Sequence, residues 1–318
     1  MDVLITRRLP DSVIATATAR FRVTFRDRTD PMSRDETVAS LRDFDAVLPT
    51  LGDLYRADIF DAVPSPRAKL LANFGVGYNH IDAAAARAAG IAVTNTPGAV
   101  TDATADIGMM LVLMSARRAS EGERLVRAGK WEGWHPTQLL GLHVTGKTIG
   151  IVGMGRIGKA IARRAHHGFG MEVVFFNRSP VPDPGLPARQ LPTLREVMAA
   201  ADVVVVAVPG GAGTRHIIDA AALAAMRPHA HLVNISRGDT VEEAALIEAL
   251  EGRRIGGAGL DVYEREPTVP ERLKALDNVT LLPHLGTAAL EVRENMGMMA
   301  VANLIAFADG KPLPNPVN

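Results

Sequence analysis

The sequence predicts an α/β protein built on doubly wound parallel sheets. From Thr148 onward, short apolar runs alternate with helix-like segments. The runs are apolar at nearly every position, which is typical of strands buried on both faces of a parallel sheet with helices between them. Residues 1–99 repeat the same rhythm more weakly, which indicates a second α/β domain.

Strands in the first half are expected at the runs DVLIT (2–6), RVTF (22–25), DAVLP (45–49), KLLANF (69–74) and IAVTN (91–95). Alanine-rich or charged segments with helical character separate them. Residues 101–129 then carry apolar side chains at helical spacing, at Ile107, Met110, Leu111 and Met114. We expect one long helix there that connects the two domains.

Strands in the second half are expected at TIGIVG (148–153), MEVVFFN (171–177), DVVVVAV (202–208), HLVNIS (231–236), IGGAGLDV (255–262) and NVTLLPH (278–284). Helices are expected over 156–169, 193–200, 220–226 and 241–250. A last helix is expected over 288–308, and the Pro-rich tail 311–318 cannot continue it. If that helix returns to the first domain, one domain comprises residues 1–99 plus 287–318 and the other residues 100–286.

Composition excludes several classes of function. The 318-residue chain is 47% hydrophobic and has 35 basic and 35 acidic side chains, so its formal charge is zero. We therefore expect no nucleic-acid and no membrane partner. The start of the chain lacks the apolar core of a secretory signal, and the cytoplasm is the expected location. Cysteine is absent, and no metal site is predicted.

The motif GMGRIG follows the first strand of the second half and opens its first helix. In this context glycines allow a tight turn, close approach of the backbone to a pyrophosphate, and close packing of the helix on the strand. The motif predicts a Rossmann-like dinucleotide site. The residues expected to contact the cofactor there are Gly153, Met154, Gly155, Arg156, Ile157 and Gly158.

The end of the next strand predicts which dinucleotide binds. NAD sites place an Asp or Glu about 20 residues beyond the glycines, where it binds the ribose hydroxyls. This chain has Asn177, Arg178 and Ser179 there instead. The missing acid removes repulsion of a 2'-phosphate, and Arg178 adds a charge-assisted donor. We predict a preference for NADPH over NADH; the alternative is that Arg178 is an ordinary solvated residue of a surface turn.

Polar residues at the carboxyl ends of strands are the candidates for catalysis, because ligands of open α/β sheets collect there. Three stand out: Arg237 in NISRG, Glu266 in DVYEREP and His284 in LLPHLG. Taken alone, Arg237 is more simply interpreted as a loop charge, Glu266 as a turn residue and His284 as a structural histidine. The other histidines, including the His166–His167 pair, are interpreted as structural.

Together with GMGRIG, the segments LVNISRGD, GAGLDVYEREP and NVTLLPHLGTA resemble the D-2-hydroxyacid dehydrogenase family over essentially the whole chain. The resemblance implies two Rossmann-like domains with the active site in the cleft between them, residues 1–99 plus 287–318 being the substrate-binding domain. It implies that Arg237 binds the substrate carboxylate and polarises the keto oxygen. His284 would donate a proton as the nicotinamide delivers hydride, and Glu266 would favour the charged imidazole.

The resemblance implies further contacts in both domains. NFGVGYNHID (73–82) resembles the loop whose amides hold the substrate carboxylate, with Val76 and Gly77 at the matching positions. Leu51 lies where the family places a residue that closes over the substrate. The alternative is that Leu51 is an ordinary apolar loop residue. Cofactor contacts are implied for Thr104, Ile235, Ser236, Arg237, Asp261, His284 and Gly286.

Within the family, the missing acid and the FGVGYNHID loop favour the glyoxylate and hydroxypyruvate reductases. Formate dehydrogenases carry Gln where this chain has Glu266, and phosphoglycerate enzymes usually take NAD. The sequence leaves two alternatives open: a reductase of bulkier 2-oxo acids such as hydroxyphenylpyruvate or 2-ketogluconate, and a dinucleotide-sensing interaction protein.

The resemblance also implies a homodimer through the cofactor domain. WEGWHPTQLLG (131–141) resembles the family's interface arm. Trp134 is the candidate to reach the neighbouring subunit's substrate site; core packing or an ordinary dimer contact is the alternative.

Overall fold

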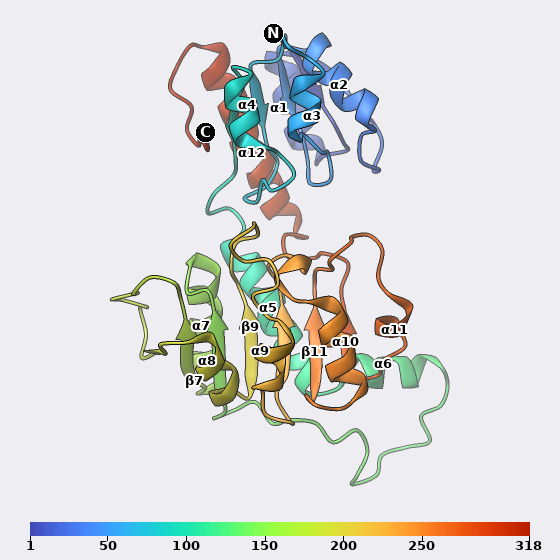
Figure 1. Cartoon of the computed structure of the whole chain (residues 1–318). Coiled ribbons are helices and arrows are strands. Elements are labelled where there is room, and N and C mark those ends of the chain that lie inside the picture. The colour runs from blue at the N-terminus through green and yellow to red at the C-terminus, as the bar shows by residue number, and fades with distance from the viewer. The chain divides into compact units, whose positions relative to one another are not determined.

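The computed structural model describes residues 1–318 and confirms the α/β class, with two parallel sheets (Figure 1). Backbone contacts divide the chain into two compact units. Unit 1 comprises Met1–Val100 and Thr287–Asn318, and unit 2 comprises Thr101–Gly286. No helix in the structure combines the length and apolar character that crossing a membrane requires.

Unit 1 contains a five-stranded parallel sheet in the order β2-β1-β3-β4-β5. Its strands are β1 (Asp2–Ile5), β2 (Arg22–Phe25), β3 (Ala46–Leu48), β4 (Leu70–Ala72) and β5 (Ala92–Thr94). Its helices are α1 (Asp11–Arg20), α2 (Arg34–Asp43), α3 (Ala57–Asp61), α4 (Ala83–Ala88) and α12 (Leu290–Ala308). Every strand falls within a run that the sequence predicts.

Alternate residues of β1, β3, β4 and β5 contribute to two apolar cores. Leu4 and Val47 pack with α2, α3 and α4 on one face. Val3 and Leu48 pack with α1 and α12 on the other. The last helix therefore belongs to unit 1 because it completes the apolar cover of this sheet.

Unit 2 contains a seven-stranded parallel sheet in the order β12-β11-β10-β9-β6-β7-β8. The strands are β6 (Thr148–Val152), β7 (Glu172–Phe176), β8 (Arg189–Gln190), β9 (Val203–Val206), β10 (His231–Asn234), β11 (Gly257–Leu260) and β12 (Val279–Leu281). The helices are α5 (Thr101–Ala116), α6 (Ala119–Arg127), α7 (Arg156–Phe169), α8 (Leu194–Ala200), α9 (Ala220–Ala224), α10 (Glu243–Glu251) and α11 (Glu271–Lys274).

Helices cover both faces of this sheet. Ile151 and Val205 point toward a core shared with α5 and α7, whereas Val204 and Val206 point toward a core shared with α8, α9 and α10. Strands buried on both faces explain the continuous apolar runs in the sequence. The order reverses at β6, which pairs with both β9 and β7, and this is where ligands of doubly wound sheets bind.

The single long helix expected over 101–129 is wrong, because the chain forms two helices there. α5 ends at Ala116, Arg118 adopts a left-handed φ of 53°, and α6 begins at Ala119. The carbonyl of Ala116 accepts a hydrogen bond of 2.8 Å from the N–H of Leu142. The chain returning from the loop after α6 therefore supplies the donor that a continuing helix would have supplied.

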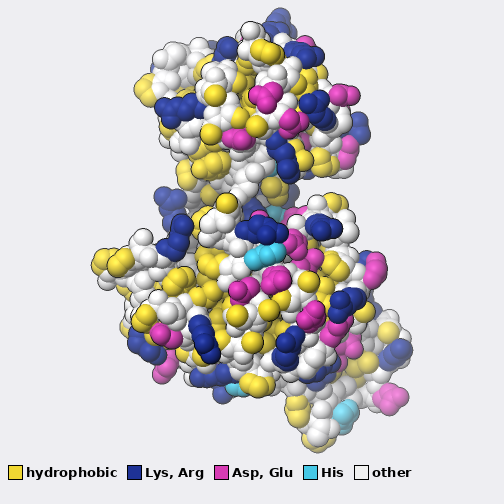
Figure 2. Space-filling view, viewed as in Figure 1, with side chains coloured by type: hydrophobic (Ala, Val, Ile, Leu, Met, Phe, Trp, Pro, Cys, Tyr) yellow, Lys and Arg dark blue, Asp and Glu magenta, His cyan; other side chains and the backbone are white.

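Basic and acidic side chains are interspersed on the face in Figure 2, without a large area of one sign. Many form ion pairs, for example Arg26 with Glu36 at 3.0 Å and Arg272 with Glu251 at 2.6 Å. Exposed pairs of this kind contribute little to stability.

Candidate active site

The glycine turn lies between β6 and α7, as its sequence context predicts. Gly153 has a φ of 100°, and its N–H donates to the carbonyl of Phe176 at 2.9 Å. A Cβ at Gly158 would overlap the carbonyl of Gly153, so glycine is required for α7 to approach the strand so closely. No side chain caps α7, and the N–H groups of its first turn are available to an anion. The turn fits a dinucleotide pyrophosphate.

The Asn177–Ser179 turn follows β7 and is held by a residue that the sequence did not identify. Gln190, on the short strand β8, donates from Nε2 to the carbonyls of Asn177 and Ser179, both at 3.2 Å. Its Oε1 accepts from the N–H of Val181 at 3.0 Å. Arg178 itself is exposed and forms no hydrogen bond or ion pair within the chain. The turn is therefore fixed while its guanidinium is free.

Arg237, Glu266 and His284 follow β10, β11 and β12 at the carboxyl edge of the sheet. The half-buried Arg237 donates from Nη1 to the carbonyl of Ser236 at 2.7 Å and pairs with no carboxylate. Burial lowers the pKa of Arg237, and the negative charges of Glu266 and Asp239 oppose that shift. A guanidinium of this kind is available to an incoming carboxylate.

The loop that carries Arg237 is braced by buried polar side chains. Asn234 Nδ2 and Thr240 Oγ1 donate to the carbonyl of Arg237 at 3.0 and 2.6 Å. The Ser236 hydroxyl contacts Asn234 and Thr240, so these three buried side chains form one hydrogen-bonded network. Asn234 was missed by the sequence reasoning, although a polar residue inside the apolar run HLVNIS was a usable signal.

Glu266 and His284 form the central pair of the site. His284 Nδ1 lies 2.8 Å from Glu266 Oε2, and both side chains are 30% exposed. Burial alone would raise the pKa of Glu266, but the hydrogen bond and charge of His284, with the N–H of Tyr263 at 3.0 Å, hold it below its usual value. The ionised carboxylate accepts a hydrogen bond from Nδ1–H, and Nε2 makes no hydrogen bond within the chain.

Asp261 anchors the segment that presents His284. Its two oxygens accept from the N–H groups of Leu285 and Gly286 at 2.6 and 2.8 Å. Thr104, near the start of α5, donates to the carbonyl of Gly286 at 3.0 Å. His284 has a φ of 56°, a conformation that is uncommon outside glycine and that its surroundings must hold. Asp261 and Thr104 thus hold the two residues that follow the histidine.

The loop after β4 in unit 1 is held by its carbonyl groups. Asn73 Nδ2 donates to the carbonyls of Gly75 and Gly77 at 3.0 and 3.1 Å, and Asn95 Nδ2 donates to that of Val76 at 2.8 Å. The N–H groups of Val76 and Gly77 donate to no atom of the chain. The loop therefore offers two adjacent amides, as a carboxylate-binding loop requires.

The remaining predicted residues lie in varied surroundings. Met154 and Ile235 are buried, and Ile157 is half-buried. Leu51 is 39% exposed beside Gly52 in unit 1. Trp134 is 80% exposed in unit 2, which excludes the core-packing alternative for this side chain.

A dinucleotide turn at the switch point of a doubly wound sheet, with an Arg, a Glu and a His at its carboxyl edge, defines an NAD(P)-dependent oxidoreductase. The sequence profile of the D-isomer specific 2-hydroxyacid dehydrogenase NAD-binding domain matches residues 109–286. The chain belongs to this family.

The chain is similar to several known proteins over nearly its full length. It is 44% identical to a glyoxylate reductase of Thermococcus onnurineus, covering 99% of this chain and 95% of that one. Its fold matches that of an NADPH-dependent glyoxylate/hydroxypyruvate reductase from Sinorhizobium meliloti, solved with NADP and malonate (TM-score 0.87, 37% identity, 99% and 96% of the chains). It also matches a D-mandelate dehydrogenase of Rhodotorula graminis (TM-score 0.86, 32% identity, 100% and 97%).

Proposed function

We propose that this protein reduces a small 2-oxo acid, glyoxylate or hydroxypyruvate, to the D-2-hydroxy acid with NADPH. The observation that carries the proposal is the His284–Glu266 pair, 2.8 Å apart, on the sheet edge that also bears Arg237. Unit 2 would bind the dinucleotide, and unit 1 would contribute to binding the substrate. The names of the Thermococcus and Sinorhizobium relatives support this substrate class.

Each residue of the trio has a role that its surroundings support. When bound, the nicotinamide supplies the hydride. Arg237, which has no carboxylate partner in the chain, would bind the substrate carboxylate and polarise the keto oxygen. His284 would donate a proton from Nε2 to that oxygen, since Nδ1 is held by Glu266. The ionised Glu266 would favour the charged imidazole before transfer and orient the ring.

The preference for NADPH is supported by the free guanidinium of Arg178 and the absence of an acid in the Asn177–Ser179 turn. A 2'-phosphate would accept charge-assisted hydrogen bonds from Arg178, and the Ser179 hydroxyl lies in the same turn. The Sinorhizobium relative is itself NADPH-dependent.

A matrix of initial rates tests substrate and cofactor together. NADPH and NADH are each paired with glyoxylate, hydroxypyruvate, pyruvate, phenylpyruvate and 2-ketogluconate, and absorbance of the reduced nicotinamide is followed. We expect kcat/KM to be highest for glyoxylate or hydroxypyruvate with NADPH. Because a hydrogen-bonded charge is worth about 1.5–3 kcal/mol, Arg178→Ala is expected to lower the NADPH/NADH ratio about 10- to 100-fold.

Other outcomes of the matrix contradict parts of the proposal. Equal or better use of NADH, or an unchanged ratio in Arg178→Ala, would disprove the cofactor preference. Higher rates with phenylpyruvate or 2-ketogluconate would favour the alternative of a reductase for bulkier 2-oxo acids. Similarity to the D-mandelate dehydrogenase of Rhodotorula graminis is the reason to test these substrates. Cofactor binding without turnover of any 2-oxo acid would favour a dinucleotide sensor.

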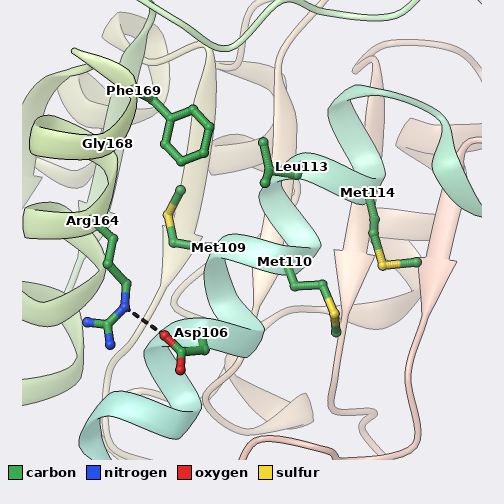
Figure 3. Close-up of a pocket in the computed structure, with 8 residues that line it drawn as sticks. All are labelled: Asp106, Met109, Met110, Leu113, Met114, Arg164, Gly168 and Phe169. Carbon is green, nitrogen blue, oxygen red and sulfur yellow. Dashed lines mark hydrogen bonds and ion pairs between the residues drawn. The ribbon is translucent and has the colours of Figure 1, made fainter.

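We also propose a homodimer formed through unit 2. An open hollow of about 710 Å³ lies between α5 and α7, lined by Met109, Met110, Leu113, Met114 and Phe169. Figure 3 shows Met109 and Phe169 directed toward one another, with the Asp106–Arg164 ion pair at one end of the hollow. Such a Met-rich, aromatic surface is typical of an interface.

The loop between α6 and β6 is the proposed occupant of this hollow in the second copy. Figure 1 shows it standing away from the sheet of unit 2, and three of its large apolar side chains, Trp131, Trp134 and Leu140, are 54%, 80% and 66% exposed. Removing such apolar area from water is the main driving force for association.

Light scattering on the purified protein at micromolar concentration tests the dimer. The wild type is expected to have twice the chain mass, and Trp134→Ser to shift the mass toward that of one chain. Leu290→Ser is the matched control, since Leu290 is 65% exposed but lies on α12 in unit 1. A monomeric wild type would contradict the proposal.

A further inference from the structure

The loop that follows β9, residues 209–214, has a backbone fixed by its own hydrogen bonds. Thr214 is buried, and its Oγ1 donates to the carbonyl of Pro209 at 2.6 Å. The N–H groups of Thr214 and Arg215 both donate to the carbonyl of Gly211, at 3.0 and 3.1 Å. The position of Gly213 within this loop is therefore set by the fold rather than by a bound ligand.

Gly213 lies against the guanidinium of Arg178. A Cβ at Gly213 would stand 3.4 Å from Arg178 Nη1 and would meet no other atom within 4 Å. Gly213 is exposed, and its φ lies outside the left-handed region. Neither space nor backbone conformation requires glycine here, so a side chain would be tolerated and would contact Arg178 first.

Sheet order explains why two distant segments meet at this point. β7 and β9 pair with opposite sides of β6, so the loops after β7 and β9 flank the glycine turn that follows β6. Gln190 fixes the backbone of the Asn177–Ser179 turn from β8. Both backbones are held independently, which leaves the Arg178 side chain as the movable part between them.

We propose that Gly213 is a specificity-determining position for the dinucleotide, because the absence of an acidic side chain there keeps Arg178 free for a 2'-phosphate. This inference rests on the proposed preference for NADPH and deepens it. A carboxylate at position 213 would bind the guanidinium fork that the phosphate needs, and it would also repel the phosphate. The loop after β9 would then control cofactor choice together with the end of β7.

The test measures binding of nucleotide fragments to the full-length protein by calorimetry. Adenosine 2',5'-bisphosphate carries the 2'-phosphate, and 5'-AMP lacks it. Gly213→Glu is expected to weaken binding of the bisphosphate by about 10- to 100-fold and to change that of 5'-AMP by less than about threefold. Gly213→Gln, which has the same shape without the charge, is expected to leave both within about threefold.

Three results would overturn the inference: wild-type affinity for the bisphosphate in Gly213→Glu, equal losses in the Glu and Gln variants, or equal losses for both nucleotides. A wild type that binds both nucleotides equally would also overturn it. Because neither fragment carries a nicotinamide, these outcomes are independent of whether any 2-oxo acid is reduced. Failure of the reductase proposal is detected separately, in the matrix of initial rates.

Discussion

His284→Ala is expected to lower kcat for glyoxylate reduction by about 10²- to 10⁴-fold, the usual contribution of a general acid. The variant loses the group whose Nδ1 is held 2.8 Å from Glu266 and whose Nε2 is free. Binding of NADPH is expected to survive, because the glycine turn and the Asn177–Ser179 turn lie on other strands. Stopped-flow turnover and a separate NADPH titration measure the two properties.

Two further variants distinguish proton donation from a structural role. Glu266→Gln keeps the shape of the side chain but removes the negative charge beside His284, so kcat for glyoxylate should fall while NADPH binding is retained. His229→Ala is the matched control. His229 also pairs with a carboxylate, Asp202 at 2.7 Å, but at the amino end of the sheet, and its variant should turn over normally. Near-parental turnover in His284→Ala would show that another group donates the proton.

The sequence predicted those helices and strands whose own residues carry the hydrophobic pattern. The helix expected over 156–169 has the bounds of α7, and the run RVTF those of β2. The break between α5 and α6 was not predictable, because it depends on Leu142, which reaches Ala116 only after a loop. The strand β8 was missed because its two residues carry no apolar run.

The residues of the candidate site also fall into two groups: those that local motifs identify and those whose role depends on tertiary contacts. Arg237, Glu266 and His284 were identified from strand ends and motifs, and the structure brings the Glu–His pair together. The carboxylate of Asp261 supports the His284 segment through its contact with Leu285, a tertiary contact that no local pattern encodes. The contact of Gly213 with Arg178 likewise depends on the order of the strands.

Gly238→Ala is expected to lower the free energy of unfolding by about 3 kcal/mol and glyoxylate kcat/KM by about 100-fold. Gly238 directly follows Arg237, and a Cβ there would overlap the backbone of Tyr263 and Glu264. That backbone cannot yield as a flexible side chain would, and the N–H of Tyr263 is a hydrogen-bond donor to Glu266. The added methyl group must therefore move the Arg237 loop or the Glu266 loop.

Chemical denaturation and steady-state kinetics on the same preparation measure both effects. Gly122→Ala is the control, because Gly122 lies inside α6 and its Cβ would meet only the end of the Leu139 side chain, at 3.4 Å. Replacing an interior helical glycine by alanine should stabilise the fold by about 0.5–1 kcal/mol and leave kcat/KM unchanged. If Gly238→Ala retained parental stability and rate, the close approach of the two loops would not be what positions Arg237 relative to Glu266.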